Sequence, residues 1–224
     1  MKIDRPTTTL ASQGSVGTIT AADITAIVLC GGAGTRMAGR DKPLELLHGR
    51  PLIEHVQQRL RAQVARIVIS CNRNHHRYAA WTDRCVHDAV QGLGPLGGSV
   101  SALPQVHTPW AFICPGDAPL LATDLVARLA TACAPVRLPA ADSICVAVAH
   151  DGTRRQPLFM LLPVQAAASM QAYLDQGQRS VHGWLALQHT VYVRCPDLAD
   201  SFANANSAAD LDALQSFTAP PLAN

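Results

Sequence analysis

The chain of 224 residues is poor in aromatic residues (4%) and in charged residues (15%), and its 18 Lys and Arg nearly balance its 16 Asp and Glu. A near-balanced charge leaves no global field that would draw the protein to nucleic acid or to an anionic membrane, so we expect neither as a partner. Any anion site has to be local. The apolar fraction of 48% suffices for a full core, which excludes disorder across the body of the chain.

The seven cysteines form no CxxC pair, so a zinc ribbon or a thioredoxin-type redox pair has no support. An odd number of cysteines scattered through apolar runs is typical of small buried side chains, and it indicates a reducing compartment. His75 and His76 have no partner at metal-ligand spacing and are interpreted as surface residues. No apolar run approaches the roughly 18 residues of a membrane span. Residues 1–22 lack the apolar stretch of a signal peptide, so we expect a flexible extension on a cytoplasmic protein.

Apolar and β-branched runs without alternation predict strands that are buried on both faces. They lie at 24–29, 66–70, 84–87, 111–114, 144–149 and 158–162. Apolar stripes and capping residues predict helices. These lie at 51–64, at 123–133 behind a Thr123 cap, at 163–175, and at 208–215 behind a Ser207 cap. Strands that alternate with helices predict an α/β fold, a single-domain Rossmann-like three-layer sandwich with a mostly parallel sheet.

A glycine-rich turn, Gly31-Gly32-Ala33-Gly34, follows the first predicted strand, and the cations Arg36 and Lys42 follow the turn. Glycine lets the backbone approach a ligand and present its N–H groups, which together with positive charge suit a polyphosphate. The loop does not match the Rossmann fingerprint, because Met37 stands where the third glycine is required. It does not match a Walker A loop either, because residues 40–41 are Arg-Asp where Lys and Ser or Thr are required. The alternative, a plain strand-to-helix turn, needs one glycine rather than three and neither cation.

Two acidic residues follow predicted strands. Asp117 comes after the run at 111–114. A carboxylate at this place is well positioned to bind Mg²⁺ beside substrate phosphate oxygens. The alternative is that Asp117 only stabilises its own turn. Asp88, taken alone, is equally well explained as a solvated loop residue. The segment 92–98 is too glycine-rich for a regular element. We interpret it as backbone that lies against a base and ribose, with a flexible hinge as the alternative.

The glycine-rich loop resembles the signature L-x-G-G-x-x-x-R-M-x-x-x-D-K of sugar-phosphate and cofactor nucleotidyltransferases. Leu29-Cys30-Gly31-Gly32, Arg36-Met37 and Asp41-Lys42 match it as they stand. Within that superfamily the chain resembles bacterial molybdenum cofactor guanylyltransferases. Further matching segments, in family order, are 71–73, Asp88, 94–98, 115–119, 202–206 and 210–211. The resemblance implies a nucleotide-diphospho-sugar transferase fold over residues 23–217, between the extension 1–22 and a tail at 218–224.

The resemblance implies a set of site residues. The implied catalytic residues are Arg36, Lys42 and Asp117, with Asp117 as the ligand of a Mg²⁺ cofactor. The implied nucleotide-binding residues are Leu29, Cys30, Gly31, Gly32, Lys42, Ser70, Asn72, Asp88, Gly94, Pro95 and Asp117. The implied residues for the second substrate are Gly98, Arg154, Arg179, Asn204 and Asn206. Ser70 stands where the family commonly has asparagine, and Gln156 stands in place of a family histidine. A solvated role for Arg179 and turn-forming roles for Asn204 and Asn206 are the alternatives.

The implied reaction transfers GMP from GTP to the terminal phosphate of molybdenum-molybdopterin and releases pyrophosphate. Three alternatives stay open: a molybdopterin cytidylyltransferase, whose loop tends to read L-A-A-G, a sugar-phosphate guanylyltransferase, and a non-catalytic nucleotide-binding protein. Retention of Asp117 and Lys42 argues against the last of these. Molybdenum-insertion proteins and molybdoenzyme chaperones are candidate partners of an expected monomer.

Overall fold

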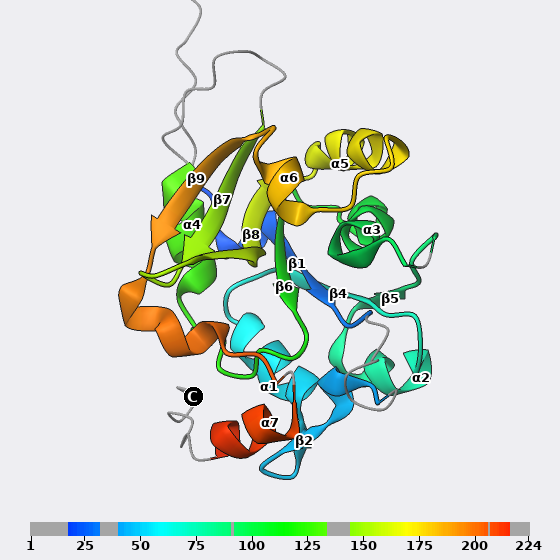
Figure 1. Ribbon diagram of the computed structural model, residues 1–224, viewed down its shortest axis with the longest axis vertical. Coiled ribbons are helices and arrows are strands. Elements are labelled where there is room, and N and C mark those ends of the chain that lie inside the picture. Colours follow the sequence, from blue (N-terminus) through cyan, green and yellow to red (C-terminus); the bar gives the residue numbers. More distant parts are fainter. Residues whose placement is uncertain (1–17, 32–39, 91, 134–143, 206, 216–224) are drawn as a thin grey trace, which may run out of the picture.

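Seven strands form one mixed sheet in the order β5-β4-β1-β6-β8-β7-β9 in the computed structural model (Figure 1). The structure describes residues 18–31, 40–90, 92–133, 144–205 and 207–215. The strands of the sheet are β1 (Ile24–Leu29), β4 (Arg66–Ser70), β5 (Arg84–Val86), β6 (Trp110–Pro115), β7 (Cys145–His150), β8 (Arg155–Pro163) and β9 (His189–Arg194). A separate short hairpin pairs β2 (Leu46–Leu47) with β3 (Arg50–Pro51).

Only β8 runs against its neighbours in the large sheet. β1 is parallel to both β4 and β6, β4 is parallel to β5, and β7 is parallel to β9. β8 pairs antiparallel with β6 and with β7. The sheet is therefore mostly parallel, as predicted, and the carboxyl ends of β1, β4 and β6 meet at one edge.

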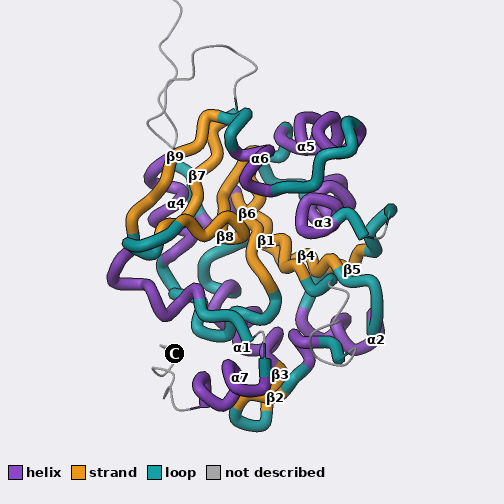
Figure 2. Tube along the Cα trace, in the orientation of Figure 1, coloured by secondary structure: helices purple, strands orange, loops and turns teal. Residues whose placement is uncertain are grey.

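Helices cover both faces of this sheet (Figure 2). They are α1 (Leu52–Leu60), α2 (His75–Tyr78), α3 (Gly94–Ala102), α4 (Leu125–Cys133), α5 (Ala166–Asp175), α6 (Val181–Leu185) and α7 (Ala208–Gln215). Short 3-10 helices lie at Ala21–Asp23, Lys42–Leu44, Ala79–Trp81, Leu103–Gln105 and Pro196–Phe202. In the described part of the chain, no helix has both the length and the apolar character that a membrane crossing needs.

Alternate residues of β1 pack into two separate cores. Ala26 and Val28 face a core that includes side chains of α1 and α4, whereas Ile27 faces a core with side chains of α3, α5 and α6. All three are fully buried, and burial of each large apolar side chain stabilises the fold by about 1.5–3 kcal/mol. Burial on both faces explains the absence of alternation in the sequence. The predicted three-layer α/β sandwich is confirmed.

Several predicted boundaries were wrong. The segment 92–98 is not irregular, because α3 begins at Gly94, whose φ of +67° suits glycine, and Pro95 takes the first turn. The helix predicted from 163 begins at Ala166, because β8 continues to Pro163 and pairs it with Trp110.

Smaller differences lie at helix ends and at one edge of the sheet. The helix predicted over 51–64 ends at Leu60, and α4 begins after Asp124, whose carbonyl accepts the N–H of Arg128, rather than behind a Thr123 cap. The predicted Ser207 cap is confirmed by a 3.1 Å bond from the Asp210 N–H to its hydroxyl. Strand β9, at the edge beside β7, was not predicted.

Candidate functional site

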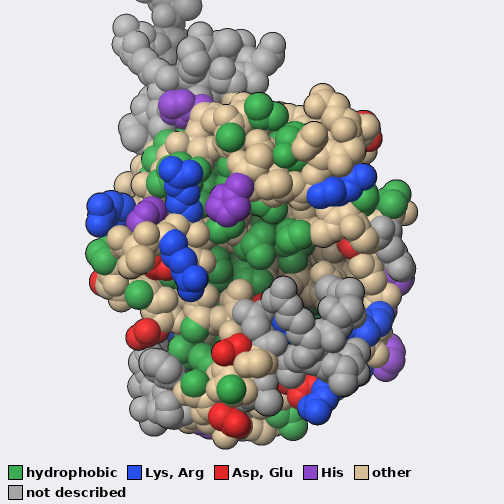
Figure 3. All heavy atoms as spheres, viewed as in Figure 1, with side chains coloured by type: hydrophobic (Ala, Val, Ile, Leu, Met, Phe, Trp, Pro, Cys, Tyr) green, Lys and Arg blue, Asp and Glu red, His purple; other side chains and the backbone are tan. Residues whose placement is uncertain are grey.

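Two clefts open beside the carboxyl ends of the parallel strands, and they share one residue. The smaller one, here the strand-end cleft, has a volume of about 190 Å³. It is lined by Leu29, Gly31, Ser70, Asp88, Gly94, Pro95, Gly98, Pro115, Asp117, Leu158 and Asn204. The larger one, here the outer cleft, has a volume of about 560 Å³. It is lined by Arg154, Arg155, Gln156, Phe202, Ala203, Asn204, Asp210, Ala213 and Leu214. The space-filling view shows a hollowed face with hydrophobic side chains at its centre (Figure 3).

Asp88 is the centre of a hydrogen-bond network at the ends of β4 and β5. Its Oδ1 accepts the Ser70 hydroxyl at 2.9 Å, and its Oδ2 accepts the Asn72 side-chain amide at 2.7 Å. Its backbone N–H donates in return to Asn72 Oδ1 at 3.0 Å. Three predicted site residues from two strands are thus brought together. The Asp88 carboxylate is held in one orientation and retains free lone pairs for a ligand.

Two glycines let other chain segments approach this network closely. A Cβ at Gly98 would lie 2.9 Å from Ser70 Oγ and 3.4 Å from Asp88 Oδ1. A Cβ at Gly31 would lie 3.2 Å from Asn72 Nδ2 and 3.6 Å from Asp88 Oδ2. The glycines of the loop and of α3 therefore keep the space around the Asp88 carboxylate open.

Cys30 takes part through its backbone rather than its thiol. Its N–H donates to the Ser70 carbonyl at 2.8 Å, which continues the β1–β4 pairing beyond Leu29. The thiol is buried in the core, and burial raises the pKa of Cys30 well above its usual value. Leu29, Gly94 and Pro95, for which the resemblance implies nucleotide binding, line the strand-end cleft.

Asp117 follows β6 and is the second acidic residue, after Asp88, that lines the strand-end cleft. Burial raises the pKa of the Asp117 carboxyl, and the nearby positive charge of Lys42 opposes that rise. Lys42 starts the 3-10 helix Lys42–Leu44 directly after Asp41. Asp117 and Lys42, two of the implied catalytic residues, therefore lie close enough to interact, although they are far apart in the sequence.

Asp41, the residue before this lysine, is fixed by two hydrogen bonds that residue type and spacing do not predict. Its carboxylate accepts the Tyr78 hydroxyl at 2.7 Å and the Asn74 side-chain amide at 2.8 Å. Asn74 has φ +53° and precedes α2, while Tyr78 ends α2 and is fully buried. The sequence marks Asp41 through the Asp-Lys pair of the signature loop. Its hydrogen-bond partners Asn74 and Tyr78 are recognisable only from the fold.

Asn204 joins the two clefts and carries a buried oxygen without a partner. Its Oδ1 has no hydrogen-bond donor among the described residues. A buried acceptor without a donor costs about 1–3 kcal/mol, so a ligand or cation that satisfied it would stabilise the site. The next residue, Ala205, donates its backbone N–H to the Asp117 carbonyl at 3.1 Å. Asn204 is thereby tied to the strand-end cleft.

Arg154 and Arg155 line the outer cleft, together with the acidic residue Asp210. Arg154 is largely exposed, with 81% of its side chain accessible, and forms a 3.5 Å ion pair with Asp151. Asp151 accepts the backbone N–H groups of Thr153 and Arg154 and the Gln156 amide, each at 2.7 Å. These bonds lower the pKa of Asp151 to about 2. Gln156 therefore supports the loop that presents Arg154.

The remaining predicted residues are not part of this arrangement. The Arg179 guanidinium donates to the carbonyls of Leu174 and Gln178 at the end of α5, and among the described residues Arg179 lines neither cleft. Gly32, Arg36 and Asn206 lie outside the described residues.

The fold is shared with solved nucleotidyltransferase structures. The chain matches molybdopterin-guanine dinucleotide biosynthesis protein A of Archaeoglobus fulgidus with a TM-score of 0.69 at 21% identity, over 85% of this chain and 96% of that one. It matches a nucleotidyl transferase from Methanothermobacter with a TM-score of 0.64 at 18% identity, over 86% and 95%. Such identities show the fold alone. Fold and strand-end cleft define the class as an α/β protein of the nucleotidyltransferase fold.

Sequence comparison gives the family within that class. Residues 26–191 match the MobA-like NTP transferase domain, and the chain belongs to this family. It is 41% identical over 187 residues to the molybdenum cofactor guanylyltransferase of Shewanella halifaxensis, covering 83% of this chain and 90% of that protein. It is 42% identical over 192 residues to the molybdenum cofactor guanylyltransferase of Cupriavidus necator, covering 84% and 94%.

Proposed function

We propose that this protein is a molybdenum cofactor guanylyltransferase, which transfers GMP from GTP to the terminal phosphate of molybdenum-molybdopterin. The observation that carries the proposal is the pair of clefts that meet at Asn204, a small one with a fixed carboxylate and a larger one with arginines on its rim. The relatives at about 40% identity bear the guanylyltransferase name and favour neither the cytidylyl nor the sugar-phosphate alternative.

In this proposal the strand-end cleft holds GTP. Guanine presents N–H donors on its N1 and N2 atoms, and the Asp88 carboxylate offers acceptor lone pairs in a fixed orientation. Ser70 and Asn72 hold that carboxylate by donating to it. The missing side chains at Gly31 and Gly98 leave room for the base.

The outer cleft then takes the pterin, whose terminal phosphate has to reach the α-phosphorus near Asn204. Arg154 supports this role through its charge and its place on the rim. An oxygen of the acceptor phosphate forms a new bond to the α-phosphorus, the bond from the α-phosphorus to the bridging oxygen breaks, and pyrophosphate leaves with that electron pair. A phosphate monoester is already anionic near neutral pH, so no general base is required.

What the chain supplies is position and charge neutralisation. Lys42 places a cation close to Asp117, and Asp41 holds the start of the lysine's helix through Tyr78 and Asn74. A preorganised cation next to transferring phosphates stabilises charge that develops in the transition state. Arg36, in the signature loop, is proposed to add a second cation.

A Mg²⁺ ion fits the oxygen donors of this cleft. Mg²⁺ takes one or two carboxylates and keeps water and substrate phosphate oxygens as its other ligands. Asp117 offers a half-buried carboxylate, and Asn204 Oδ1 in the same cleft is a buried oxygen that has no partner among the residues that the structure describes. We propose that Asp117, supported by Asn204, binds the ion, which when bound neutralises phosphate charge.

Pyrophosphate release tests the proposal. The purified chain is supplied with molybdenum-molybdopterin and either GTP, CTP or ATP, each with Mg²⁺ or with EDTA. We expect release only with GTP and Mg²⁺, and none when the pterin is omitted. Equal release with CTP would contradict the guanine assignment, and undiminished release in EDTA would contradict the metal assignment.

We also propose the compartment, the oligomeric state and the partner proteins. The seven cysteines are free thiols, which supports a reducing compartment such as the cytoplasm. We further propose a monomer that exchanges substrate and product with molybdenum-insertion proteins and molybdoenzyme chaperones. Gel filtration of the purified chain, with and without GTP, tests the monomer.

A further inference from the structure

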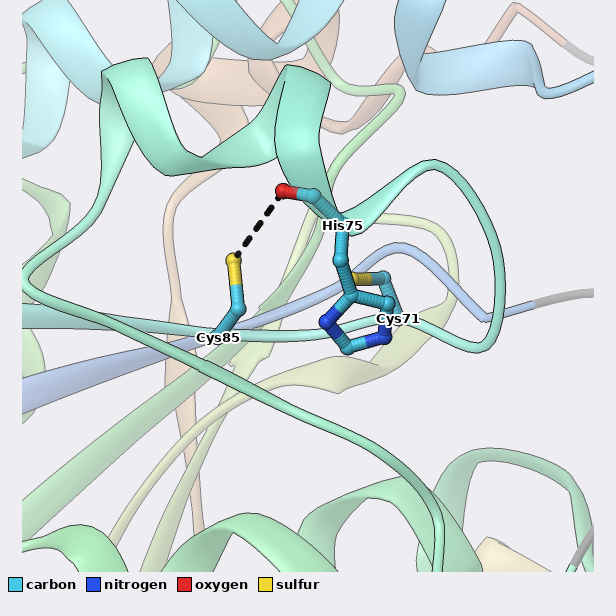
Figure 4. Close-up of side chains that lie close together, drawn as sticks. All are labelled: Cys71, His75 and Cys85. Atoms are coloured by element: carbon cyan, nitrogen blue, oxygen red, sulfur yellow. Dashed lines mark hydrogen bonds between the residues drawn. The ribbon is translucent and has the colours of Figure 1, made fainter.

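A cluster of soft metal ligands lies beside the strand-end cleft but outside it. The ligand atoms of Cys71, His75 and Cys85 all lie within 4.8 Å of one another (Figure 4). Cys71 directly follows β4, His75 begins α2, and Cys85 is the middle residue of β5. Three elements thus converge at one point. His75 is partly exposed, but the expectation that it has no possible metal-ligand partner was wrong.

The donor set selects the kind of metal. Two thiols and one imidazole suit Zn²⁺, which is bound by cysteine sulfur and histidine nitrogen in tetrahedral sites, whereas Mg²⁺ requires oxygen. His87 lies next to His75 but is not one of the three clustered ligands. Its ring centroid is 3.4 Å from that of His75, and its Nδ1 is 2.8 Å from His75 Nε2. We propose that Cys71, His75 and Cys85 bind one Zn²⁺ ion.

The same cysteines do not form a reactive thiol site. Cys71 is fully buried, and burial raises its pKa to about 12, so without a bound cation it is a thiol rather than a nucleophilic thiolate. The Cys85 thiol instead donates to the His75 carbonyl at 3.9 Å. A second thiol pair, Cys133 and Cys145, has sulfurs 3.6 Å apart. It belongs to no metal-ligand group among the residues that the structure describes, which makes it a matched control.

The position of the cluster gives the ion a role. Cys71 is the chain neighbour of Asn72, while Cys85 lies three residues before Asp88, to which Asn72 is bonded. Zinc at this point would fasten the ends of β4 and β5 to α2, and structural zinc sites contribute directly to folding free energy. The proposal depends on the geometry of the cluster alone and does not require the guanylyltransferase assignment.

Cobalt substitution tests the site by its colour. The full chain is purified under reducing conditions, stripped with a chelator and titrated with Co²⁺. We expect the intense visible bands of tetrahedral Co²⁺ and thiolate-to-cobalt charge transfer, both saturating at one ion per chain and lost when Zn²⁺ is added. Cys85→Ser and His75→Gln should each weaken Co²⁺ binding by more than about tenfold. The control Cys145→Ser should give the wild-type spectrum.

Folding is checked separately, because a buried cysteine variant can fail to fold for other reasons. Far-ultraviolet circular dichroism establishes that Cys85→Ser, a change at a half-buried position, remains folded. In the folded proteins, Zn²⁺ should raise the melting temperature of the wild type and of Cys145→Ser but not that of Cys85→Ser. A wild type without charge transfer at stoichiometric Co²⁺, or a spectrum unchanged in Cys85→Ser, would overturn the proposal.

Discussion

The two clefts differ in how firmly their polar side chains are fixed. In the strand-end cleft, Ser70, Asn72 and Asp88 are bonded to one another across two strands. In the outer cleft, which has about three times the volume, the Arg154 side chain is 81% accessible and forms a 3.5 Å ion pair with Asp151. A fixed network favours one ligand over close analogues, because an analogue leaves buried groups unpaired. An open arginine rim instead suits a large anionic substrate.

The largest expected effect comes from Asp117 of the strand-end cleft and from Lys42, whose charge acts on it. Asp117→Ala or Lys42→Ala should lower kcat by roughly 10²–10³-fold, as does loss of one strong transition-state stabiliser. Single-turnover kinetics with saturating GTP and pterin measure the change. Asp175→Ala, at the end of α5, is the matched control and should retain full activity. An Asp117→Ala variant with near wild-type turnover would contradict its role as metal ligand.

Asp88→Asn should impair the recognition of guanine in the strand-end cleft and leave the outer cleft unaffected. The amide removes one acceptor and adds a donor facing guanine, and loss of a bidentate contact costs about 1–3 kcal/mol of discrimination, or roughly 5- to 150-fold. The ratio of kcat/KM for GTP to that for ITP, which lacks the 2-amino group, should fall with the variant. The KM for the pterin should not change. A ratio that stays constant would show that Asp88 does not contact the base.

Gly31→Ala adds a single methyl group beside Asn72 and Asp88, and should weaken the binding of GTP without slowing the chemical step. The added Cβ would lie 3.2 Å from Asn72 Nδ2, so the Asn72–Asp88 pair has to move by a few tenths of an ångström. Overpacking of this kind costs about 1–3 kcal/mol, and less where a side chain can adjust. We expect a higher KM for GTP with kcat nearly retained, since Lys42 and Asp117 are untouched. Unchanged KM would place the base elsewhere.

Arg154→Ala should weaken the outer cleft alone. Because the arginine is exposed, its contribution to binding a phosphate is screened, and we expect a rise in pterin KM of roughly 3- to 5-fold, equivalent to about 1 kcal/mol. The KM for GTP should stay constant. Arg179→Ala serves as the comparison, because Arg179 bonds to carbonyls of α5 and its neighbouring turn rather than to either cleft. An equal effect of both substitutions on pterin KM would refute the assignment.

The smallest effect is a dependence of stability on acid. Hydrogen bonds lower the pKa of Asp151 to about 2 in the folded chain, below the ordinary value near 4. The ionised carboxylate therefore stabilises the fold above about pH 4, and that contribution is lost as the pH falls towards 2. Thermal melts at pH 6 and pH 3, made with wild type and Asp151→Asn, measure it. The difference between the two proteins should shrink at pH 3.

The elements that carry the strand-end cleft were predictable from local patterns. β1, β4 and β6 are apolar on both faces, so their runs stand out in the sequence, and a glycine-rich turn after β1 marks a ligand edge. The signature loop and Asp117 then follow from residue type and position. Recognition of the family added Ser70, Asn72 and Asp88, whose mutual bonds agree with a shared site.

What could not be predicted depends on contacts between distant segments. Glycine-rich α3 has poor intrinsic helix propensity, and it is stabilised by packing: Leu96 is buried in the core, and Gly98 lies close to Leu29 and Ser70 because it has no side chain. Edge strand β9 is half-buried, so its apolar signal is weak. The ligand cluster needs β4 to lie beside β5, and no spacing rule links Cys71 to Cys85. The unpartnered oxygen of Asn204 is likewise a property of the fold.

In the proposed reaction, a guanylyl group passes from GTP in the strand-end cleft to an acceptor in the outer cleft. Incubation of the chain and molybdenum-molybdopterin with GTP labelled at the α-phosphorus or, separately, at the γ-phosphorus follows this transfer. We predict that the α label appears in the pterin product and the γ label only in pyrophosphate. Transfer of the γ label to the pterin, or retention of both labels in GTP, would contradict it.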